Sequence, residues 1–166
     1  MKPLFSIIVP AYNASCYIER CIKSIINQTD NDYELIIVDD GSTDNTFELC
    51  ENFEKENKNI KIFHQDNKGV VFARAKGVKE SKGEYLIFCD SDDMIHKDTL
   101  KLIKNVIDKI EPDMVTFKMS NSLEQLEKVN IGKYYNKEEI EKYIFPYLLE
   151  DKNGKYFKPS IWRWSI

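Results

Sequence analysis

The sequence predicts a single α/β domain built on a mostly parallel β-sheet flanked by helices. Short apolar runs rich in β-branched residues alternate four times with segments in which apolar residues recur every three or four positions. This alternation is typical of a parallel sheet with right-handed helical crossovers. The 166 residues are enough for one hydrophobic core and too few for two ordinary domains.

The apolar runs give the expected strands. Four of them span residues 4–9, 33–38, 60–63 and 85–88. Pro10 is expected to end the first, and a further short strand is expected over residues 114–117, after Pro112 stops the preceding helix. Runs that are apolar nearly throughout indicate strands covered on both faces.

Four amphipathic segments give the expected helices. They span residues 14–28, residues 44–57, the segment between Gly69 and Lys82, and the segment from Leu100 to Ile110. The side chains expected to face the sheet are Ile18, Cys21, Ile22, Ile25 and Ile26 in the first helix, Phe47, Cys50 and Phe53 in the second, Val71, Ala75 and Val78 in the third, and Leu100, Ile103, Val106, Ile107 and Ile110 in the fourth.

The last fifty residues break this alternation. Asn136 is expected to cap a helix that Pro146 kinks, and a polar stretch follows over residues 150–158. Trp162 and Trp164 near the end are expected to cover a core edge or an interface, with stacking on a sugar as the alternative. The sequence ends as if interrupted within the domain.

Composition narrows the classes of function. A hydrophobic fraction of 42% and a charged fraction of 31% are those of a soluble globular protein, which argues against disorder and a membrane span. The net charge of -4, with lysines dispersed among acids, argues against a nucleic-acid partner. The cysteines form no CxxC pair and His64 and His96 stand far apart, so we expect no zinc site and buried thiols in a reducing cytosol. The N-terminal run is expected to be a strand and not a signal peptide.

Three carboxylates follow directly on the apolar run of residues 85–88: Asp90, Asp92 and Asp93. Like charges this close repel one another, and a bound cation relieves the repulsion. Carboxylate oxygens suit Mg²⁺ or Mn²⁺, which takes one or two protein carboxylates and completes its coordination with phosphate and water. The stretch therefore predicts a metal and a phosphate together. The alternative is a solvated turn whose acids cap the helix near Lys97.

Ligands of open parallel sheets bind beyond the carboxyl ends of the strands. Pro10 and Tyr12 lie at the end of the first expected strand, and Asp39 and Asp40 follow the second. An aromatic ring, a carboxylate that accepts a base N–H and a nearby metal-binding cluster favour a pocket for a nucleoside diphosphate. For Asp39 and Asp40, the alternative is a strand-to-helix turn in which Gly41 has a positive φ.

Four motifs occur in order along the chain: VPAYN at residues 9–13, VDDGSTD at 38–44, NKGVVFARAKGVKESKGEY at 67–85 and FCDSDD at 88–93. In order and spacing they resemble the N-terminal half of the inverting family 2 glycosyltransferases, which have the Rossmann-like GT-A fold. The resemblance covers roughly the first 120 residues.

The resemblance implies roles for the acids. The DxD motif of the family falls on Asp90, Ser91 and Asp92. It implies that Asp92 ligates Mn²⁺ or Mg²⁺ on the nucleotide diphosphate, and that Asp90 lies near the ribose or the metal. The acid that binds the base falls on Asp40, with Asp39 as a helper.

The resemblance also implies roles for residues around the ligand. Pro10 and Tyr12 match the wall on which the base packs. Lys68 is expected to contact the diphosphate, whose developing charge a cation and a lysine stabilise. Arg74 is a second candidate for this contact, and the alternative is an ion pair with Glu80 or another nearby acid.

The resemblance implies an enzyme that transfers a sugar, from a UDP-sugar above other nucleotide sugars, to an acceptor hydroxyl with inversion. Residues 1–120 would bind the donor, and residues 121–166 would begin the acceptor side of the same domain. The family's general base has no identified match, and Glu150 and Asp151 are weak candidates. A carbohydrate or lipid-linked acceptor, surface polysaccharide synthesis and a place in the cytoplasm, peripheral to the membrane, are implied by family only.

Other classes of function stay open from the residues. A nucleotide-sugar-binding domain without turnover would explain the missing general base. A phospho-receiver domain also clusters aspartates around Mg²⁺, but here the acid pair follows the second strand and not the first. A dinucleotide-binding oxidoreductase is disfavoured because no GxGxxG follows the first strand.

Overall fold

The structure, a computed structural model, describes residues 2–112, 114–116 and 160–163. The chain divides into two units, Met1–Val115 with Ile161–Ile166 and Thr116–Ser160, and the fold described here is that of the first. The helix expected after Asn136 and the pair Glu150 and Asp151 lie outside the described residues.

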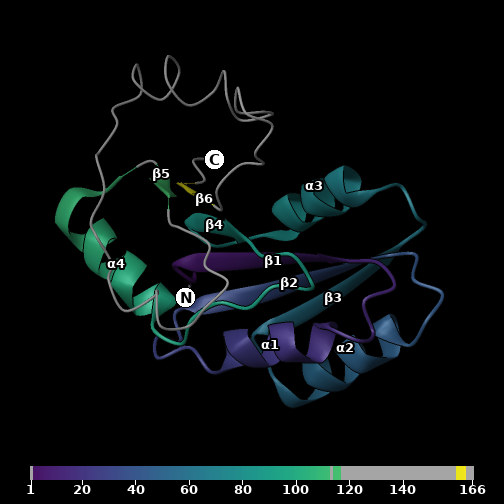
Figure 1. The fold of residues 1–166 in the computed structure, drawn as a ribbon. Coiled ribbons are helices and arrows are strands. Elements are labelled where there is room, and N and C mark those ends of the chain that lie inside the picture. The colour runs from purple at the N-terminus through teal and green to yellow at the C-terminus, as the bar shows by residue number, and fades with distance from the viewer. Residues whose placement is uncertain (1, 113, 117–159, 164–166) are drawn as a thin grey trace, which may run out of the picture. The chain divides into compact units, whose positions relative to one another are not determined.

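A six-stranded sheet in the order β3-β2-β1-β4-β6-β5 runs through this unit (Figure 1). β1 pairs in parallel with β2 and β4, and β2 pairs in parallel with β3, whereas β6 runs antiparallel to β4. The strands are β1 (Phe5–Ala11), β2 (Tyr33–Asp40), β3 (Ile60–Gln65), β4 (Tyr85–Phe88), β5 (Met114–Thr116) and β6 (Ser160–Arg163). The predicted α/β fold with a mostly parallel sheet is therefore confirmed.

Within the described residues four helices accompany the sheet, with α1 and α2 on one face and α3 on the other (Figure 1). They are α1 (Ile18–Ile26), α2 (Thr46–Glu56), α3 (Val70–Glu80) and α4 (Thr99–Ile110). The buried stripes predicted for α1 and α4 are largely confirmed, except that Ile110 is exposed. None of the helices in the described part of the chain is long and apolar enough to cross a membrane.

The buried face of α3 differs from the expected one. Ala73 and Gly77 are buried, whereas Val71 is 70% exposed and Ala75 is exposed as well. Ala73 joins a core cluster with Ile8 and other apolar residues of β1, β2 and β4. Val78 is half-buried and packs against this cluster, as predicted. The closest contact is nevertheless made by small residues, which let the helix backbone approach the sheet, so the prediction is wrong for Val71 and Ala75.

β1 also continues through Pro10 to Ala11, contrary to the expectation that Pro10 ends it. Its pairing with β4 stops at Ile8, opposite Phe88, while its pairing with β2 continues to Ala11. Pro10 therefore lies where β1 is paired on one side only. Its missing N–H costs no hydrogen bond between strands there.

Two further expectations need correction. α1 begins at Ile18 and not at Ala14, whose carbonyl accepts turn hydrogen bonds from Tyr17 N (2.8 Å) and Ile18 N (2.9 Å). All four cysteines are free, and three are buried as expected, but Cys16 is exposed.

Candidate functional site

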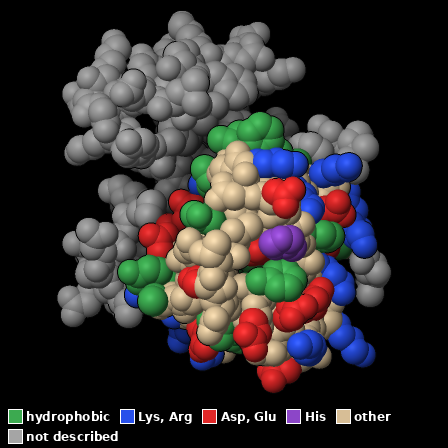
Figure 2. Space-filling model, turned by 90° about the vertical axis from the view of Figure 1, so that its right-hand side faces the viewer, with side chains coloured by type: hydrophobic (Ala, Val, Ile, Leu, Met, Phe, Trp, Pro, Cys, Tyr) green, Lys and Arg blue, Asp and Glu red, His purple; other side chains and the backbone are tan. Residues whose placement is uncertain are grey.

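An open pocket of about 490 Å³ lies at the carboxyl ends of β1, β2 and β4. Figure 2 views the side of the molecule on which the loops after β1 and β2 lie in Figure 1, with acidic, basic and hydrophobic side chains interspersed on it. The lining residues are Pro10, Ala11, Tyr12, Asp40, Asn67, Gly69, Val70, Ala73, Arg74, Asp90, Ser91 and Asp92. Seven of the residues predicted for the site therefore line one pocket, with Arg74, the second candidate for the diphosphate contact, among them, whereas Asp39 and Lys68 are not lining residues.

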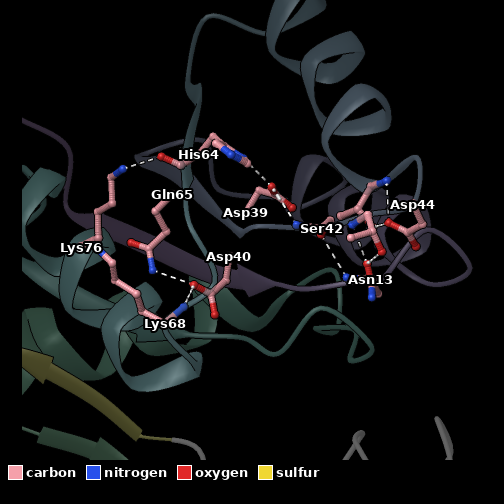
Figure 3. A network of polar contacts seen from close by, with 11 residues as sticks. Asn13, Asp39, Asp40, Ser42, Asp44, His64, Gln65, Lys68 and Lys76 are labelled. Carbon is pink, nitrogen blue, oxygen red and sulfur yellow. Dashed lines mark hydrogen bonds and ion pairs between the residues drawn. The ribbon is translucent and has the colours of Figure 1, made fainter.

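Asp40 organises the loop between β3 and α3 (Figure 3). Its Oδ1 accepts hydrogen bonds from Gln65 Nε2 (2.7 Å) and Lys68 N (2.9 Å), and its Oδ2 accepts one from Gly69 N (2.7 Å). The residue is only 3% exposed. A carboxylate offers about four lone pairs, so Asp40 keeps acceptor capacity on Oδ2 for a ligand N–H.

The electrostatics of Asp40 favour the ionised form. Burial alone opposes ionisation, but the hydrogen bonds from Lys68 N, Gln65 and Gly69 N, together with the Lys68 charge, leave the pKa of Asp40 below its ordinary value. Asp40 is thus a carboxylate that faces the pocket and acts as an acceptor only.

Asp39 has different contacts, because successive strand residues point to opposite faces of the sheet. Its Oδ2 accepts a hydrogen bond from Ser42 N (3.3 Å) and lies 2.7 Å from Nδ1 of His64 (Figure 3). Asp39 is fully buried, and its Oδ1 has no hydrogen-bond partner. Its observed contacts hold the turn after β2 to β3.

Residues 89–98 connect β4 to α4 and are called the acid loop below. Asp90 Oδ1 lies 2.6 Å from Nη2 of Arg74, so the arginine on α3 pairs with this acid and not with Glu80. Asp92 is exposed, and its carboxylate accepts no hydrogen bond within the described part of the chain. The pKa of Asp93 is raised by burial and by the negative charges of Asp92 and Asp90.

These residues fit a divalent cation that is held mainly by a ligand. No group of three His, Cys, Asp or Glu side chains in residues 2–112 is placed to hold a metal ion. Mg²⁺ needs only one or two protein carboxylates when phosphate and water complete its octahedron. The Asp92 carboxylate has no hydrogen-bond partner in the described residues. Asp92 is therefore the side chain best placed to provide a carboxylate ligand, with Asp90 beside it.

A polar network that sequence reasoning did not assign to the site ties the loop after β1 to the loop after β2 (Figure 3). Asn13 has a φ of 47°. Its Oδ1 accepts a hydrogen bond from Thr43 N (2.8 Å), and its backbone N–H donates one to Ser42 Oγ (3.0 Å). Asp44 accepts from Ser15 N (3.1 Å) and from Thr46 N (3.0 Å). The cluster of capping residue types after the second strand was the available signal.

The Asp44 contacts predict an acid-sensitive stability. Burial opposes its ionisation, but the hydrogen bonds from Thr46 and Ser15 lower the pKa of Asp44 from 3.8 to about 2. Because the folded pKa is depressed, the stabilisation is complete above the unfolded value and is lost as the pH falls through the folded value. We expect the stability gap between the native protein and Asp44→Asn to narrow between about pH 5 and pH 2.

Urea unfolding at a series of pH values measures this gap. Asp108→Asn is the control, because Asp108 is exposed on α4 and has no hydrogen bond among the described residues. A gap for Asp44→Asn that stays constant over this pH range would contradict the role given to the Asp44 carboxylate.

A parallel sheet with a polar pocket and an acid loop at the carboxyl ends of its strands defines an α/β domain of the GT-A-like, ligand-binding kind. The family model "Glycosyl transferase family 2" matches residues 6–156, and the chain belongs to this family. The family resemblance predicted from the sequence is therefore confirmed.

Curated relatives agree with this assignment. The chain is 33% identical over 149 residues to the glycosyltransferase GlyG of Streptococcus pneumoniae, covering 89% of this chain and 44% of GlyG. It is 42% identical over 101 residues to the putative teichuronic acid biosynthesis glycosyltransferase TuaG of Bacillus subtilis, covering 60% of this chain and 40% of TuaG. The chain thus spans less than half the length of these relatives.

Solved structures show the same fold. S. aureus TarS 1-349 in complex with UDP is 35% identical with a TM-score of 0.66, over 70% of this chain and 35% of TarS. TarS has also been solved with UDP-GlcNAc, at a TM-score of 0.65 and over 70% of this chain and 34% of TarS. The mannosyltransferase PcManGT of Pyrobaculum calidifontis, solved with GDP-Man and Mn²⁺, has a TM-score of 0.64 over 72% of this chain and 36% of PcManGT; at 21% identity it supports the fold alone.

Proposed function

We propose that this chain is the donor-binding part of an inverting glycosyltransferase that transfers a sugar from a UDP-sugar to an acceptor hydroxyl. The observation that carries the proposal is the convergence of Tyr12, Asp40 and Asp92 on one pocket at the carboxyl ends of the strands. The similarity to TarS, which binds UDP and UDP-GlcNAc, supports uridine as the nucleoside.

Each side chain of the pocket has a role in this proposal. The base packs against Pro10 and Tyr12, which is half exposed and offers a free ring face. The remaining lone pair of Asp40 accepts a hydrogen bond from the base N–H, a contact that an acceptor-only carboxylate makes well. Asp39 has the weaker case as a helper, because it is not a lining residue.

The acid loop and α3 serve the diphosphate. Asp92, with Asp90 beside it, would hold Mn²⁺ or Mg²⁺, which when bound neutralises charge on the leaving diphosphate. Arg74 pairs with Asp90 and lines the pocket, so its guanidinium would be available to the phosphates of a bound donor. Lys68 fixes the loop through its backbone N–H to Asp40, and its exposed ammonium is available to the diphosphate.

The acceptor is proposed as a chemical class only. The name of TuaG, a putative teichuronic acid biosynthesis glycosyltransferase, supports a carbohydrate acceptor in surface polysaccharide synthesis. A lipid-linked acceptor and a place at the cytoplasmic face of the membrane are proposed from the family resemblance alone. The general base is not identified, since Glu150 and Asp151 lie outside the described residues. A nucleotide-sugar-binding domain without turnover is the second candidate, because no general base is identified among the described residues.

Isothermal titration with UDP, with and without Mn²⁺, tests the proposal. We expect Mn²⁺ to strengthen UDP binding in the native protein, and Asp92→Ala to reduce the affinity in Mn²⁺ to its metal-free level. The matched control is Asp98→Ala, which removes another carboxylate of the acid loop. Asp98 accepts a hydrogen bond from Thr29 Oγ1 and does not line the pocket. Absence of UDP binding by a folded sample would refute the donor site.

A further inference from the structure

One edge of α1 contacts the backbone of both aspartates of the DxD motif. Arg20 Nη2 donates a hydrogen bond to the carbonyl oxygen of Asp92 at 2.7 Å. Its neighbour Cys21 contacts the carbonyl oxygen of Asp90 through Sγ at 3.6 Å. Consecutive residues of one helix therefore hold the two carbonyls that flank Ser91.

The same edge of α1 continues to bind the chain beyond the DxD motif. Ser24 Oγ accepts a hydrogen bond from Ile95 N at 3.2 Å. Gln28 Nε2 donates to the carbonyl of His96 at 2.7 Å, and Gln28 Oε1 accepts from Leu100 N at 3.1 Å. Arg20 and Cys21 are followed by Ser24 three or four residues later and by Gln28 two residues beyond the end of α1. This side of α1 and the residues just after it therefore hold the chain from Asp90 to the start of α4.

Arg20 differs from the other members of this edge. Cys21 and Gln28 are buried and satisfy groups of the protein interior, so removing them damages the fold. Arg20 is exposed, and its guanidinium also lies over the ring of Tyr17, 5.2 Å from the centroid, which fixes its direction. Its positive charge lies close to the acids of the loop, because Nη2 bonds the carbonyl of Asp92.

We propose that Arg20 is a positioning residue for the metal-binding acid loop: by holding the carbonyl of Asp92 it fixes the turn that carries the Asp92 carboxylate. The proposal rests on the proposed function, because it assigns Arg20 a part in donor binding. A fixed turn places the carboxylate before the cation and diphosphate arrive, and the guanidinium reduces the repulsion among Asp90, Asp92 and Asp93.

The first test measures the loop without any ligand. Arg20→Met keeps the aliphatic stem and removes the donor and the charge, and Arg20→Lys keeps the charge. Lys23→Met is the matched control, because it removes the same charge from the same helix, and the ion pair that Lys23 makes within the described part of the chain is with Glu19 on the surface. In metal-free protein we expect amide hydrogen exchange over residues 90–95 to quicken in Arg20→Met, and to match the native protein in Lys23→Met.

The second test measures the metal dependence of UDP binding. We expect Arg20→Met to lower the affinity for UDP in the presence of Mn²⁺ about tenfold, as for other groups that orient a metal ligand. Affinity for UDP without metal should stay unchanged, and Arg20→Lys should recover part of the loss. A purely structural role would instead lower both affinities together, and that result would overturn the proposal.

The two tests separate the proposal from the function on which it rests. If the native protein binds no UDP, the proposed function fails, while hydrogen exchange still decides whether Arg20 fixes the loop. If the native protein binds UDP with Mn²⁺ and Arg20→Met matches Lys23→Met in exchange or in Mn²⁺ dependence, the positioning role of Arg20 is overturned.

Discussion

Replacing Gly77 with valine is expected to lower the free energy of unfolding by about 3 kcal/mol, the upper part of the usual range for overpacking a core. Gly77 lies on α3 against β1, and a Cβ atom at this position would overlap with Cγ2 of Ile8. Ile8 is fully buried in the central strand, and its β-branched side chain has little rotamer freedom to move aside. Urea unfolding followed by circular dichroism measures the loss.

Two companion variants make this prediction specific. Ala75→Val places the same side chain at an exposed position of the same helix, so it should cost only the lower helix propensity of valine, about 0.6 kcal/mol. Gly77→Ala combined with Ile8→Ala should cost less than the sum of the single changes, because the new methyl group occupies space left by Ile8. Equal costs for Gly77→Val and Ala75→Val would contradict the close approach of α3 to β1.

The strand and helix order was predictable because the core patterns are strong. In α1, the isoleucines and Cys21 recur at helical spacing, and the structure buries Ile18, Cys21, Ile22 and Ile25. In α3, the pattern was misleading because the contact with the sheet depends on small residues, and no hydrophobic periodicity marks Gly77 as a packing position. Large apolar residues of α3, such as Val71, stand exposed instead.

The strand ends were harder to predict, because acids there resemble loop residues. β2 continues through Asp39 and Asp40, which was not expected, since their hydrogen-bond partners come from residues far along the chain. Gln65 and Gly69 bond to Asp40, and His64 bonds to Asp39. A buried carboxylate is tolerated in a strand only with such partners, and sequence periodicity does not reveal them.

The rule that ligands bind at the carboxyl ends of parallel strands sufficed to bring three of the four motifs that line the pocket to one edge of the sheet. The rule does not say which side chain of each motif faces the ligand. Arg74 and Asp90 form their ion pair across the pocket from α3 to the acid loop, and Arg20 reaches the same loop from α1. Such pairs depend on how helices are placed on the sheet, which a single sequence does not encode in a readable pattern.

Asp40→Asn is expected to weaken UDP binding by about 10- to 100-fold, the affinity equivalent of losing a hydrogen bond to a charged group. It should also lower the free energy of unfolding by about 2 kcal/mol. Three N–H donors converge on the two oxygens of Asp40. An amide has one oxygen, so its NH2 group must face either Gly69 N or the pair Gln65 and Lys68 N, and at least one donor loses its partner.

Asp39→Asn is the matched control, because it makes the same chemical change at the adjacent residue. Its oxygen can keep the contacts with Ser42 N and His64, and its NH2 group can occupy the position of Oδ1, which has no partner to lose. We therefore expect UDP affinity in Asp39→Asn to stay within about threefold of the native value, since even a tenfold change needs about 1.4 kcal/mol. Titration of both variants with UDP in Mn²⁺ decides between the neighbours. If Asp39→Asn weakened UDP binding as much as Asp40→Asn, base recognition would involve both faces of β2, and the assignment of that role to Asp40 alone would be wrong.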